Sequence, residues 1–348
     1  MKDNRILIIC HLTNSECNGQ VAKTKDVIEF LKKNGYKVFI LNYGQMGLLK
    51  KFLLSKRIIK KYQKIILMPG GKNALFYYSY LMLKLKKTDA HYIAIGGWVQ
   101  NLLKNNKYSR KIRLLKIFKC IYLQNRETMS VFCEKGFNNL CFVSSFSSKQ
   151  FLTKREFNEK QQLYNNVQEY KFCFFARVER TKGVLLACNA ITKIKQNNPN
   201  IKIGLDIYGE CKDKLLRDEL KEIESQNPFI SIKGVITGNN AIRTLSNYYC
   251  MLFPTFYKGE GTPHTIIESF GAALPVIASD WAYNSEIITN KKTGLIFSLE
   301  KENDLINKIM WSINNPEKIR AMSKNCYLES DKYNVNVLLR PLLEKLEN

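Results

Sequence analysis

Short, strongly apolar segments alternate with longer amphipathic segments along the whole chain. RILIIC at 5–10 and YKFCFFA at 170–176 are examples of the apolar segments. Such runs are typical of strands that are buried on both faces of a parallel sheet, and the segments between them are long enough for helical crossovers. The pattern therefore predicts an α/β fold with doubly wound parallel sheets.

The alternation occurs twice, which predicts two domains and agrees with a length of 348 residues. The strands predicted in the first half are Arg5–Cys10, Lys37–Leu41, Lys64–Met68, His91–Ile95, Cys120–Leu123 and Leu140–Val143, with helices near 21–34, 46–62, 73–87, 109–118 and 126–135. Those predicted in the second half are Tyr170–Ala176, Ile201–Tyr208, Phe229–Ile232, Tyr249–Phe253, Pro275–Ala278 and Leu295–Phe297.

A polar segment from Ser144 to about Tyr170 has neither a helical nor a strand period and divides the two halves. We predict a Rossmann-like N-terminal domain at 1–150, a linker at 151–169 and a second Rossmann-like domain at 170–325. A C-terminal helix at 326–348 is expected to return toward the first domain. Ligands of such sheets bind beyond the carboxyl ends of the strands, so the two domains are expected to face a common cleft.

The net charge of the chain is +25, and it is concentrated in the first half. Residues 1–150 contain 28 basic and 7 acidic side chains. Two basic amphipathic stretches, 50–64 and 104–119, are typical of helices that lie on an anionic membrane surface, although two solvated helix faces would give the same pattern. Nucleic acid is a weaker expectation, because the lysines are spread over many helices and no recognised nucleic-acid motif occurs.

The ten cysteines include no C-x-x-C pair, and several lie in apolar strand-like runs. This usage predicts reduced thiols in a cytoplasmic protein and no zinc site or disulfide framework. The N-terminal segment is too polar for a signal peptide, and no apolar run reaches the roughly 18 residues of a membrane span. We therefore expect a soluble protein, at most peripherally attached to the inner face of the cell membrane.

Loops that follow predicted strands of the second half carry the most unusual residues. Arg177 and Lys182 lie in a turn closed by Gly183 before a helix, which is typical of a diphosphate site, although a pair of solvated cations would look the same. Tyr208 and Gly209 form a second strand-end turn, where a glycine permits close approach of backbone or ligand.

The segment 254–279 is the most informative of these loops. It contains Glu260 and Gly261, then Thr262 as the predicted N-cap and Pro263 as the predicted first residue of a helix that extends to about Ala273. Glu268 lies on that helix among large apolar residues. The spacing lets both carboxylates point into one cleft over the helix N-terminus.

These motifs, R-x4-K-G at 177–183, Y-G at 208–209 and E-G-x-P-x4-E-x6-P-V at 260–276, resemble the donor half of retaining GT-B glycosyltransferases. The resemblance is to the family-four group that builds bacterial capsule, exopolysaccharide and lipopolysaccharide. It implies that Arg177 and Lys182 hold the donor diphosphate, that Glu268 binds the ribose hydroxyls, and that Glu260 lies near the reacting carbon of the sugar. Glu260, Lys182 and Arg177 are thus the expected catalytic residues, with Gly261, Thr262 and Pro263 beside the donor.

The first domain matches the same family less fully. Gly19 belongs to a segment that resembles the glycine-bearing loop near the donor phosphates, and Gln20, Lys23 and Thr24 open the following helix as acceptor-side candidates. Gly97 and Trp98, after another strand, are further acceptor-side candidates. His91 begins its strand, at the wrong end for a cleft residue, so no histidine is assigned a catalytic role.

The resemblance implies transfer of a sugar from a nucleotide-diphosphate donor to a hydroxyl of a lipid-linked glycan, with retention of the anomeric configuration. No D-x-D motif occurs, so no metal and no other cofactor is expected. A nucleotide-sugar epimerase or a phosphorylase on the same fold remains an alternative, as does a basic nucleic-acid-binding protein.

Overall fold

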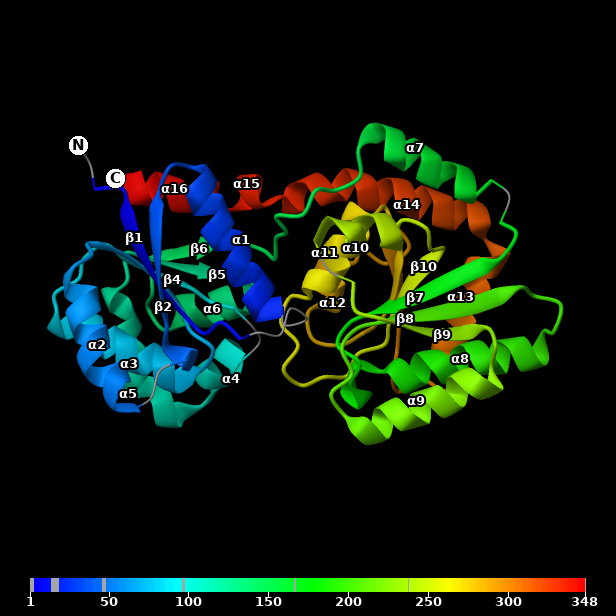
Figure 1. Ribbon diagram of the computed structural model, residues 1–348, viewed down its shortest axis with the longest axis horizontal. Helices are drawn as coiled ribbons and strands as arrows, with labels where there is room; N and C mark the ends of the chain where they lie inside the picture. The colour runs from blue at the N-terminus through cyan, green and yellow to red at the C-terminus, as the bar shows by residue number, and fades with distance from the viewer. Residues whose placement is uncertain are drawn as a thin grey trace. The chain divides into compact units, whose positions relative to one another are not determined.

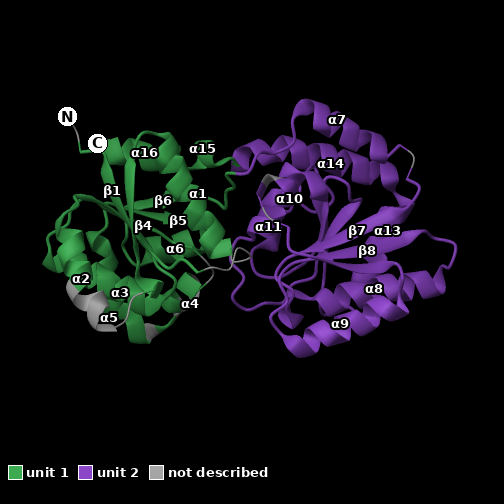
Figure 2. Ribbon diagram, viewed as in Figure 1, with its two compact units in different colours: residues 1–148, 334–348 green, residues 149–333 purple. Residues whose placement is uncertain are grey.

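The computed structural model describes residues 3–13, 19–45, 48–95, 98–165, 167–236 and 238–347, with the backbone alone at a few helical positions. The chain divides into two compact units (Figure 2). Unit 1 consists of residues 1–148 and 334–348, and unit 2 consists of residues 149–333. Each unit contains one six-stranded parallel sheet, which confirms the predicted α/β class.

Unit 1 has the strand order β2-β1-β3-β4-β5-β6 (Figure 1). Its strands are β1 (Arg5–Cys10), β2 (Lys37–Asn42), β3 (Lys64–Met68), β4 (Ala90–Ile93), β5 (Cys120–Leu123) and β6 (Leu140–Phe142). Its α-helices are α1 (Gly19–Lys33), α2 (Leu48–Lys60), α3 (Lys72–Lys84), α4 (Trp98–Lys104), α5 (Ser109–Ile112), α6 (Arg126–Glu134), α15 (Val335–Leu338) and α16 (Arg340–Glu347).

Helices cover both faces of the unit 1 sheet. Leu7 and Ile9 of β1 face a core formed with α3, α4 and α6, whereas Ile6 and Ile8 face α1 and α16 on the other side. This two-sided burial explains why the strands contain uninterrupted apolar runs instead of alternating polar and apolar residues.

Unit 2 has the strand order β12-β11-β10-β7-β8-β9. Its strands are β7 (Tyr170–Phe175), β8 (Ile203–Tyr208), β9 (Ile230–Gly234), β10 (Cys250–Phe253), β11 (Val276–Ser279) and β12 (Gly294–Phe297). Its α-helices are α7 (Lys154–Leu163), α8 (Val184–Asn197), α9 (Lys214–Gln226), α10 (Gly238–Leu245), α11 (His264–Gly271), α12 (Asn284–Ile287), α13 (Asp304–Asn314) and α14 (Pro316–Ser330).

The unit 2 sheet is also covered on both faces. Phe172 and Phe174 of β7 pack with α8, α9 and α13, whereas Cys173 faces a core that includes α10 and α11. All twelve predicted strands are present in the two sheets, with ends that differ by no more than two residues from the prediction.

The prediction that residues 151–169 form a linker between the two domains is wrong. Residues 154–163 form α7, which belongs to unit 2 and packs there through Phe157 and the stem of Lys160. Thr153 and Glu156 form a reciprocal capping box at its start, so the helix has a well-defined N-terminus despite its polar sequence. The chain passes from unit 1 to unit 2 at 148–149, before the expected linker begins.

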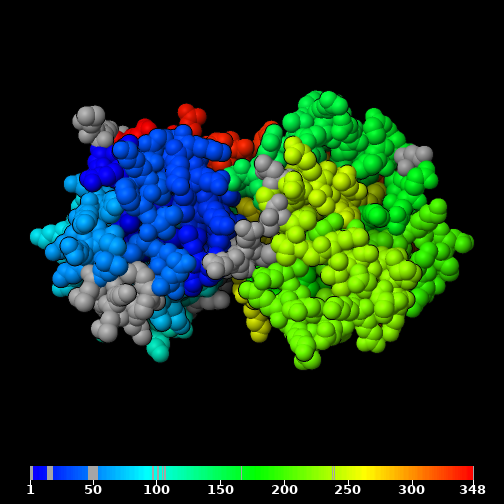
Figure 3. Space-filling view, viewed as in Figure 1, coloured from blue at the N-terminus to red at the C-terminus, as the bar shows by residue number. Residues whose placement is uncertain are grey.

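The C-terminal region also differs from the prediction of one helix at 326–348. Helix α14 ends at Ser330 in unit 2, and residues 334–348 belong to unit 1, where Leu339, Leu342 and Leu346 are buried. Figure 3 shows this segment in red beside blue N-terminal residues on the surface of unit 1. Helix α4, in contrast, was not predicted from the sequence.

Two further features concern the cysteines and the helices of the chain. Nine cysteines lie in the part of the chain that the structure describes, and all nine are free. In that same part, no helix is both long enough and apolar enough to cross a bilayer.

Candidate functional site

The loops after β7, β8, β10 and β11 lie at the carboxyl ends of four adjacent strands of unit 2. Lys182 and Glu260 come from two of these loops and form a buried ion pair, with 2.5 Å between Lys182 Nζ and Glu260 Oε2. Thr255 Oγ1 donates to the same carboxylate oxygen at 3.0 Å. The side chains of Lys182 and Glu260 are only 8% and 9% exposed, so water screens the pair weakly.

Arg177 lies beside this pair. Its guanidinium donates to Glu179 Oε1 at 2.5 Å, and its Cζ lies 5.4 Å from the centroid of the Tyr257 ring. Lys182 Nζ lies 4.8 Å from the centroid of the same ring. The two predicted diphosphate ligands are thus close together, and each already has a carboxylate partner.

Two glycines bring these loops into contact. Gly183 has a φ of +80°, and a Cβ there would lie 2.0 Å from the carbonyl oxygen of Pro254. Gly209 has a φ of +146°, and a Cβ there would lie 1.8 Å from the carbonyl oxygen of Ala176. Backbone, not ligand, therefore makes the close approach at both positions, and only glycine fits there.

Helix α11 begins one residue later than the sequence predicts. Pro263, with a ψ of 121°, is the N-cap in place of Thr262, and the helix runs from His264 to Gly271. Its N-terminus has no side-chain cap, so its first N–H groups have no such partner. Gly261 and Thr262 precede the helix in the same loop as Glu260.

Glu268, one turn into α11, is buried and accepts from His264 and Lys149. Its Oε1 lies 2.9 Å from His264 Nε2 and 2.5 Å from Lys149 Nζ. Burial alone would raise the pKa of this carboxyl, but His264 and Lys149 outweigh that effect and lower the pKa of Glu268 to about 2. The side chain is therefore a carboxylate at neutral pH, and its oxygens can accept hydrogen bonds from hydroxyl groups.

Tyr208 differs from the sequence-based expectation of a donor-binding side chain. It is buried in the core of unit 2, with its hydroxyl 2.7 Å from that of Tyr248, which in turn donates to Asp206. The aromatic side chain packs in the core of unit 2, so only the backbone of residues 208 and 209 can face the site.

The acceptor-side candidates of α1 lie in unit 1. Gly19 is the first residue of α1, and a Cβ there would meet no atom of the described residues within 4 Å. Lys23 is buried and donates to Gln124 Oε1 at 3.0 Å. Thr24 is buried too, and its hydroxyl donates to the carbonyl of Gln20 at 2.8 Å.

The remaining candidates of unit 1 are only partly described. Gly97 and residues 14–18 of the glycine-bearing segment lie outside the described residues. Trp98 opens α4, and its buried indole N–H has no hydrogen-bond partner among the residues that the structure describes. His91 is fully buried between Asp89 and Tyr122, which fits the absence of a catalytic assignment.

The structure adds residues that the sequence did not single out: Thr255, Tyr257, His264 and Lys149. Thr255, Tyr257 and His264 had a signal, since all three lie in the segment 254–279, whereas Lys149 had none. Across the described ranges, no three His, Cys, Asp or Glu residues are grouped so that they could hold a metal ion. The site brings together two cations, two carboxylates and the start of a helix, which suits an anionic ligand that also bears hydroxyl groups.

Comparison with solved structures supports the fold assignment. A glycosyltransferase from Rickettsia africae ESF-5 superimposes with a TM-score of 0.75 at 18% identity and covers 100% of this chain and 98% of its own. Anabaena Alr3699/HepE, solved in complex with UDP-glucose, gives a TM-score of 0.73 at 11% identity and covers 98% and 99% of the two chains. The GT-B fold implied by the sequence motifs is thereby confirmed.

Sequence comparison identifies the family. The uncharacterized glycosyltransferase MJ1059 of Methanocaldococcus jannaschii is 29% identical over 124 residues, a match that spans 35% of this chain and 29% of that protein's length. The family described as glycosyl transferases group 1 matches residues 155–329, half of the chain and nearly all of unit 2. The chain therefore belongs to the glycosyl transferases group 1 family.

Proposed function

We propose that this chain is a retaining glycosyltransferase that moves a hexosyl group from a nucleotide-diphosphate donor to a hydroxyl of a lipid-linked glycan. We place this reaction in the synthesis of a bacterial surface polysaccharide, such as capsule or lipopolysaccharide.

One observation carries the donor assignment: Arg177 and Lys182 lie within 6 Å of one aromatic ring, at the carboxyl edge of the unit 2 sheet. Two adjacent cations suit the two phosphates of a nucleoside diphosphate, with a point charge from Lys182 and a planar fork from Arg177. Anabaena Alr3699/HepE was solved with UDP-glucose, which supports a UDP-linked sugar as the first donor to try.

The proposed catalysis is mainly electrostatic. As the bond from the anomeric carbon to the diphosphate oxygen breaks, negative charge grows on the leaving diphosphate, and Arg177 and Lys182 stabilise it. The acceptor hydroxyl attacks from the same face, and its proton passes to the leaving phosphate oxygen, which gives retention without a covalent enzyme intermediate. No metal or other cofactor is required in this scheme, because the two side-chain cations supply the positive charge.

Glu260 and Glu268 have different proposed roles. When the donor binds, its diphosphate replaces Glu260 as the partner of the Lys182 ammonium group. Glu260 then contacts the donor sugar. Glu268 binds the ribose hydroxyls through its carboxylate, while Lys149 and His264 hold Oε1. Gly261, Thr262 and Pro263 line the donor beside the uncapped start of α11.

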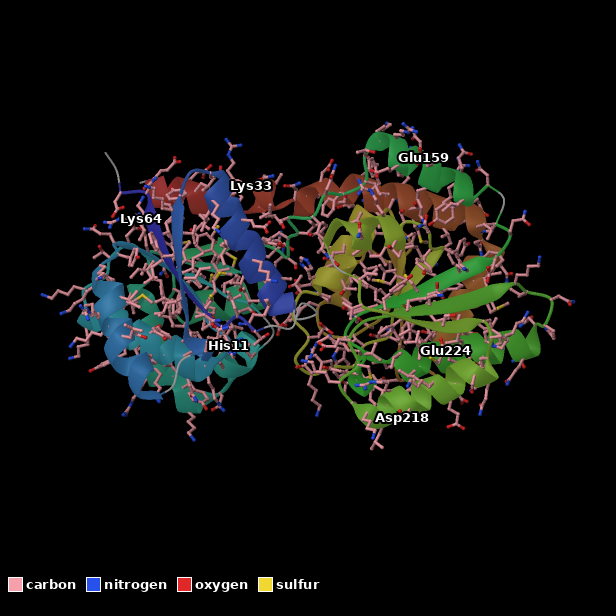
Figure 4. All side chains as sticks on the ribbon, in the orientation of Figure 1. His11, Lys33, Lys64, Glu159, Asp218 and Glu224 are labelled. Carbon is pink, nitrogen blue, oxygen red and sulfur yellow. The ribbon has the colours of Figure 1, made fainter. Side chains whose placement is uncertain are left out.

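The acceptor side is proposed to lie in unit 1, with Gln20 and Trp98 as its contacts among the described residues. Unit 1 has 29 basic and 9 acidic residues, a net charge of +20. Exposed apolar side chains on α2 and α3, namely Leu54, Tyr80 and Leu83, accompany lysines on the same helices. Figure 4 shows Lys33 and Lys64 at the surface of unit 1, and Asp218 and Glu224 on α9 of unit 2.

Positive charge together with exposed apolar side chains suits an anionic lipid surface. We therefore propose that unit 1 attaches the protein to the cytoplasmic face of the cell membrane, where a lipid-linked acceptor is available. Co-sedimentation with vesicles of anionic lipid should exceed that with neutral vesicles and should weaken with salt. Equal partitioning into both kinds of vesicle would contradict membrane attachment.

The donor assignment is tested with purified protein and a panel of nucleotide-sugars, beginning with UDP-glucose. We expect one or more of these to raise the melting temperature and to be hydrolysed slowly without an acceptor. Release of an epimerised sugar nucleotide would instead favour an epimerase. Retention of the anomeric configuration is then read from the product by NMR.

Lys182→Ala should lower turnover by a factor of about 100 or more, as expected when a charge-stabilising group is lost. The same change leaves Glu260 buried without its cation, which also destabilises the fold. The double variant Lys182→Ala with Glu260→Gln removes that second effect. It should recover the melting temperature of the wild type but not the activity, and recovery of activity would contradict the assignment.

A further inference from the structure

The ring of Tyr257 is shared by both proposed diphosphate ligands. Its centroid lies 5.4 Å from Arg177 Cζ and 4.8 Å from Lys182 Nζ. Both distances are within the range of cation–π attraction. We infer that Tyr257 is a positioning residue that holds Arg177 and Lys182 together for the diphosphate, an inference that rests on the proposed function.

The surrounding loop fixes the place of this ring. Gly259 leaves room for it, because a Cβ at that position would lie 2.8 Å from three of its atoms. The Tyr257 carbonyl accepts from Trp281 Nε1 at 2.9 Å and from the Glu260 N–H at 3.0 Å. The backbone of Tyr257 is thus fixed by two hydrogen bonds, and its ring lies against Gly259.

Two like charges repel each other, so they need a partner that stays with them throughout the reaction. In this structure each cation has a carboxylate, Glu179 for Arg177 and Glu260 for Lys182. A bound diphosphate competes with these carboxylates for the same cationic groups. The face of the Tyr257 ring does not compete with phosphate oxygens, so it can hold the cations both before and after the donor binds.

The Tyr257 ring is a more important contact for Arg177 than for Lys182. Lys182 has a second aromatic neighbour, since its Nζ lies 5.9 Å from the centroid of the buried Phe253 ring. For Arg177, which is about one-third exposed, the described residues offer no ring other than Tyr257. Loss of the ring should therefore free Arg177 more than Lys182.

The test compares Tyr257→Leu with Tyr257→Phe in the full-length chain. Isothermal titration calorimetry measures the affinity for UDP, GDP, ADP and dTDP, each beside its monophosphate. For the diphosphate that binds the wild type best, Tyr257→Leu should weaken binding roughly five- to thirtyfold. The monophosphate should lose less, because it engages fewer of the cationic groups, and Tyr257→Phe should remain within about twofold of the wild type.

Phe256→Leu is the matched control, because Phe256 is a neighbouring ring in the same loop, whereas the rings that the described residues place over the two cations are those of Tyr257 and Phe253. It should leave diphosphate affinity unchanged. Equal affinity of Tyr257→Leu and wild type would overturn the inference, as would equal losses for diphosphate and monophosphate. If the wild type binds none of the four diphosphates, the proposed function is overturned and the inference with it.

Discussion

Lys160 is the most deeply buried lysine among the described side chains that lie outside the candidate site. It projects from α7 into the core of unit 2 and donates to the carbonyl of Tyr248. Burial lowers the pKa of Lys160 to about 7. The amine is therefore neutral in the folded protein over a pH range in which the unfolded chain still holds its proton.

This difference makes stability depend on pH. Between pH 7 and about 10 the unfolded state binds one more proton at Lys160, so this residue makes the free energy of unfolding rise with pH. Lys160→Met should remove that contribution, which amounts to at most about 1.4 kcal/mol per pH unit. Urea denaturation at several pH values between 7 and 8.5 measures the slope of the free energy of unfolding against pH for the wild type and the variant.

Lys154→Met is the control for this prediction, because Lys154 is an exposed lysine on the same helix. Its slope should equal that of the wild type. A Lys160→Met variant with an unchanged slope would show that the amine is charged in the folded protein.

At the scale of single residues, the sequence predicted what depends on local spacing. Arg177, Lys182, Glu260 and Glu268 follow strands or open a helix, and the structure places all four at the carboxyl edge of one sheet. The contact of Lys149 with Glu268 joins residues 119 positions apart, so no local pattern could reveal it. Tyr208 was assigned to the donor site, but alternate side chains of a strand point to opposite faces of the sheet, and the ring of Tyr208 points into the core.

At the scale of elements, buried parallel strands were predicted well because their apolar runs are unambiguous. Helix α7 was missed because Phe157 is its only large apolar side chain that is buried, which leaves no clear amphipathic period. Its start did have a signal, the T-x-x-E pattern at 153–156, whose two side chains cap each other's backbone. Helix α4 was missed because it is too short for a helical period to be recognised in the sequence.

The turn after β8 is expected to tolerate no side chain. In Gly209→Ala the new Cβ would overlap the Ala176 carbonyl, which directly precedes Arg177, so the loop that carries Arg177 must move. We expect a lower melting temperature and weaker binding of the donor nucleotide. Thermal denaturation and calorimetric titration measure the two effects.

Gly234→Ala separates backbone strain from steric overlap. Gly234 also has a positive φ, +75°, but a Cβ there would meet no atom of the described residues within 4 Å. This variant should lose only the roughly 1 kcal/mol of a strained residue and keep its nucleotide affinity. Equal losses of affinity in the two variants would contradict a specific role for the 209 turn.

At the scale of the whole molecule, unit 1 depends on a segment from the far end of the sequence. Leu339, Leu342 and Leu346 are buried in the core that also contains Ile6 and Ile8 of β1. Leu342→Ala should cost about 2–5 kcal/mol of stability, as for other large-to-small changes in a core. Hydrogen exchange should show the loss of protection in β1 and α1, while β7 and β10 of unit 2 stay protected.

Val337→Ala is the matched control for this experiment, because Val337 lies in the neighbouring helix α15 and is 58% exposed. It should change the exchange of neither unit. A uniform loss of protection across both units in Leu342→Ala would show that they unfold together as one cooperative body.

The split composition of unit 1 also sets an order for folding during synthesis. Domains usually fold from the N-terminus as they leave the ribosome. Here residues 1–148 emerge first, but the part of their core that α16 covers beside α1 stays exposed until all 185 residues of unit 2 have been translated. Unit 2, a single continuous segment, can reach its native state before its older neighbour does, so the half of the protein that is made first is the last to be completed.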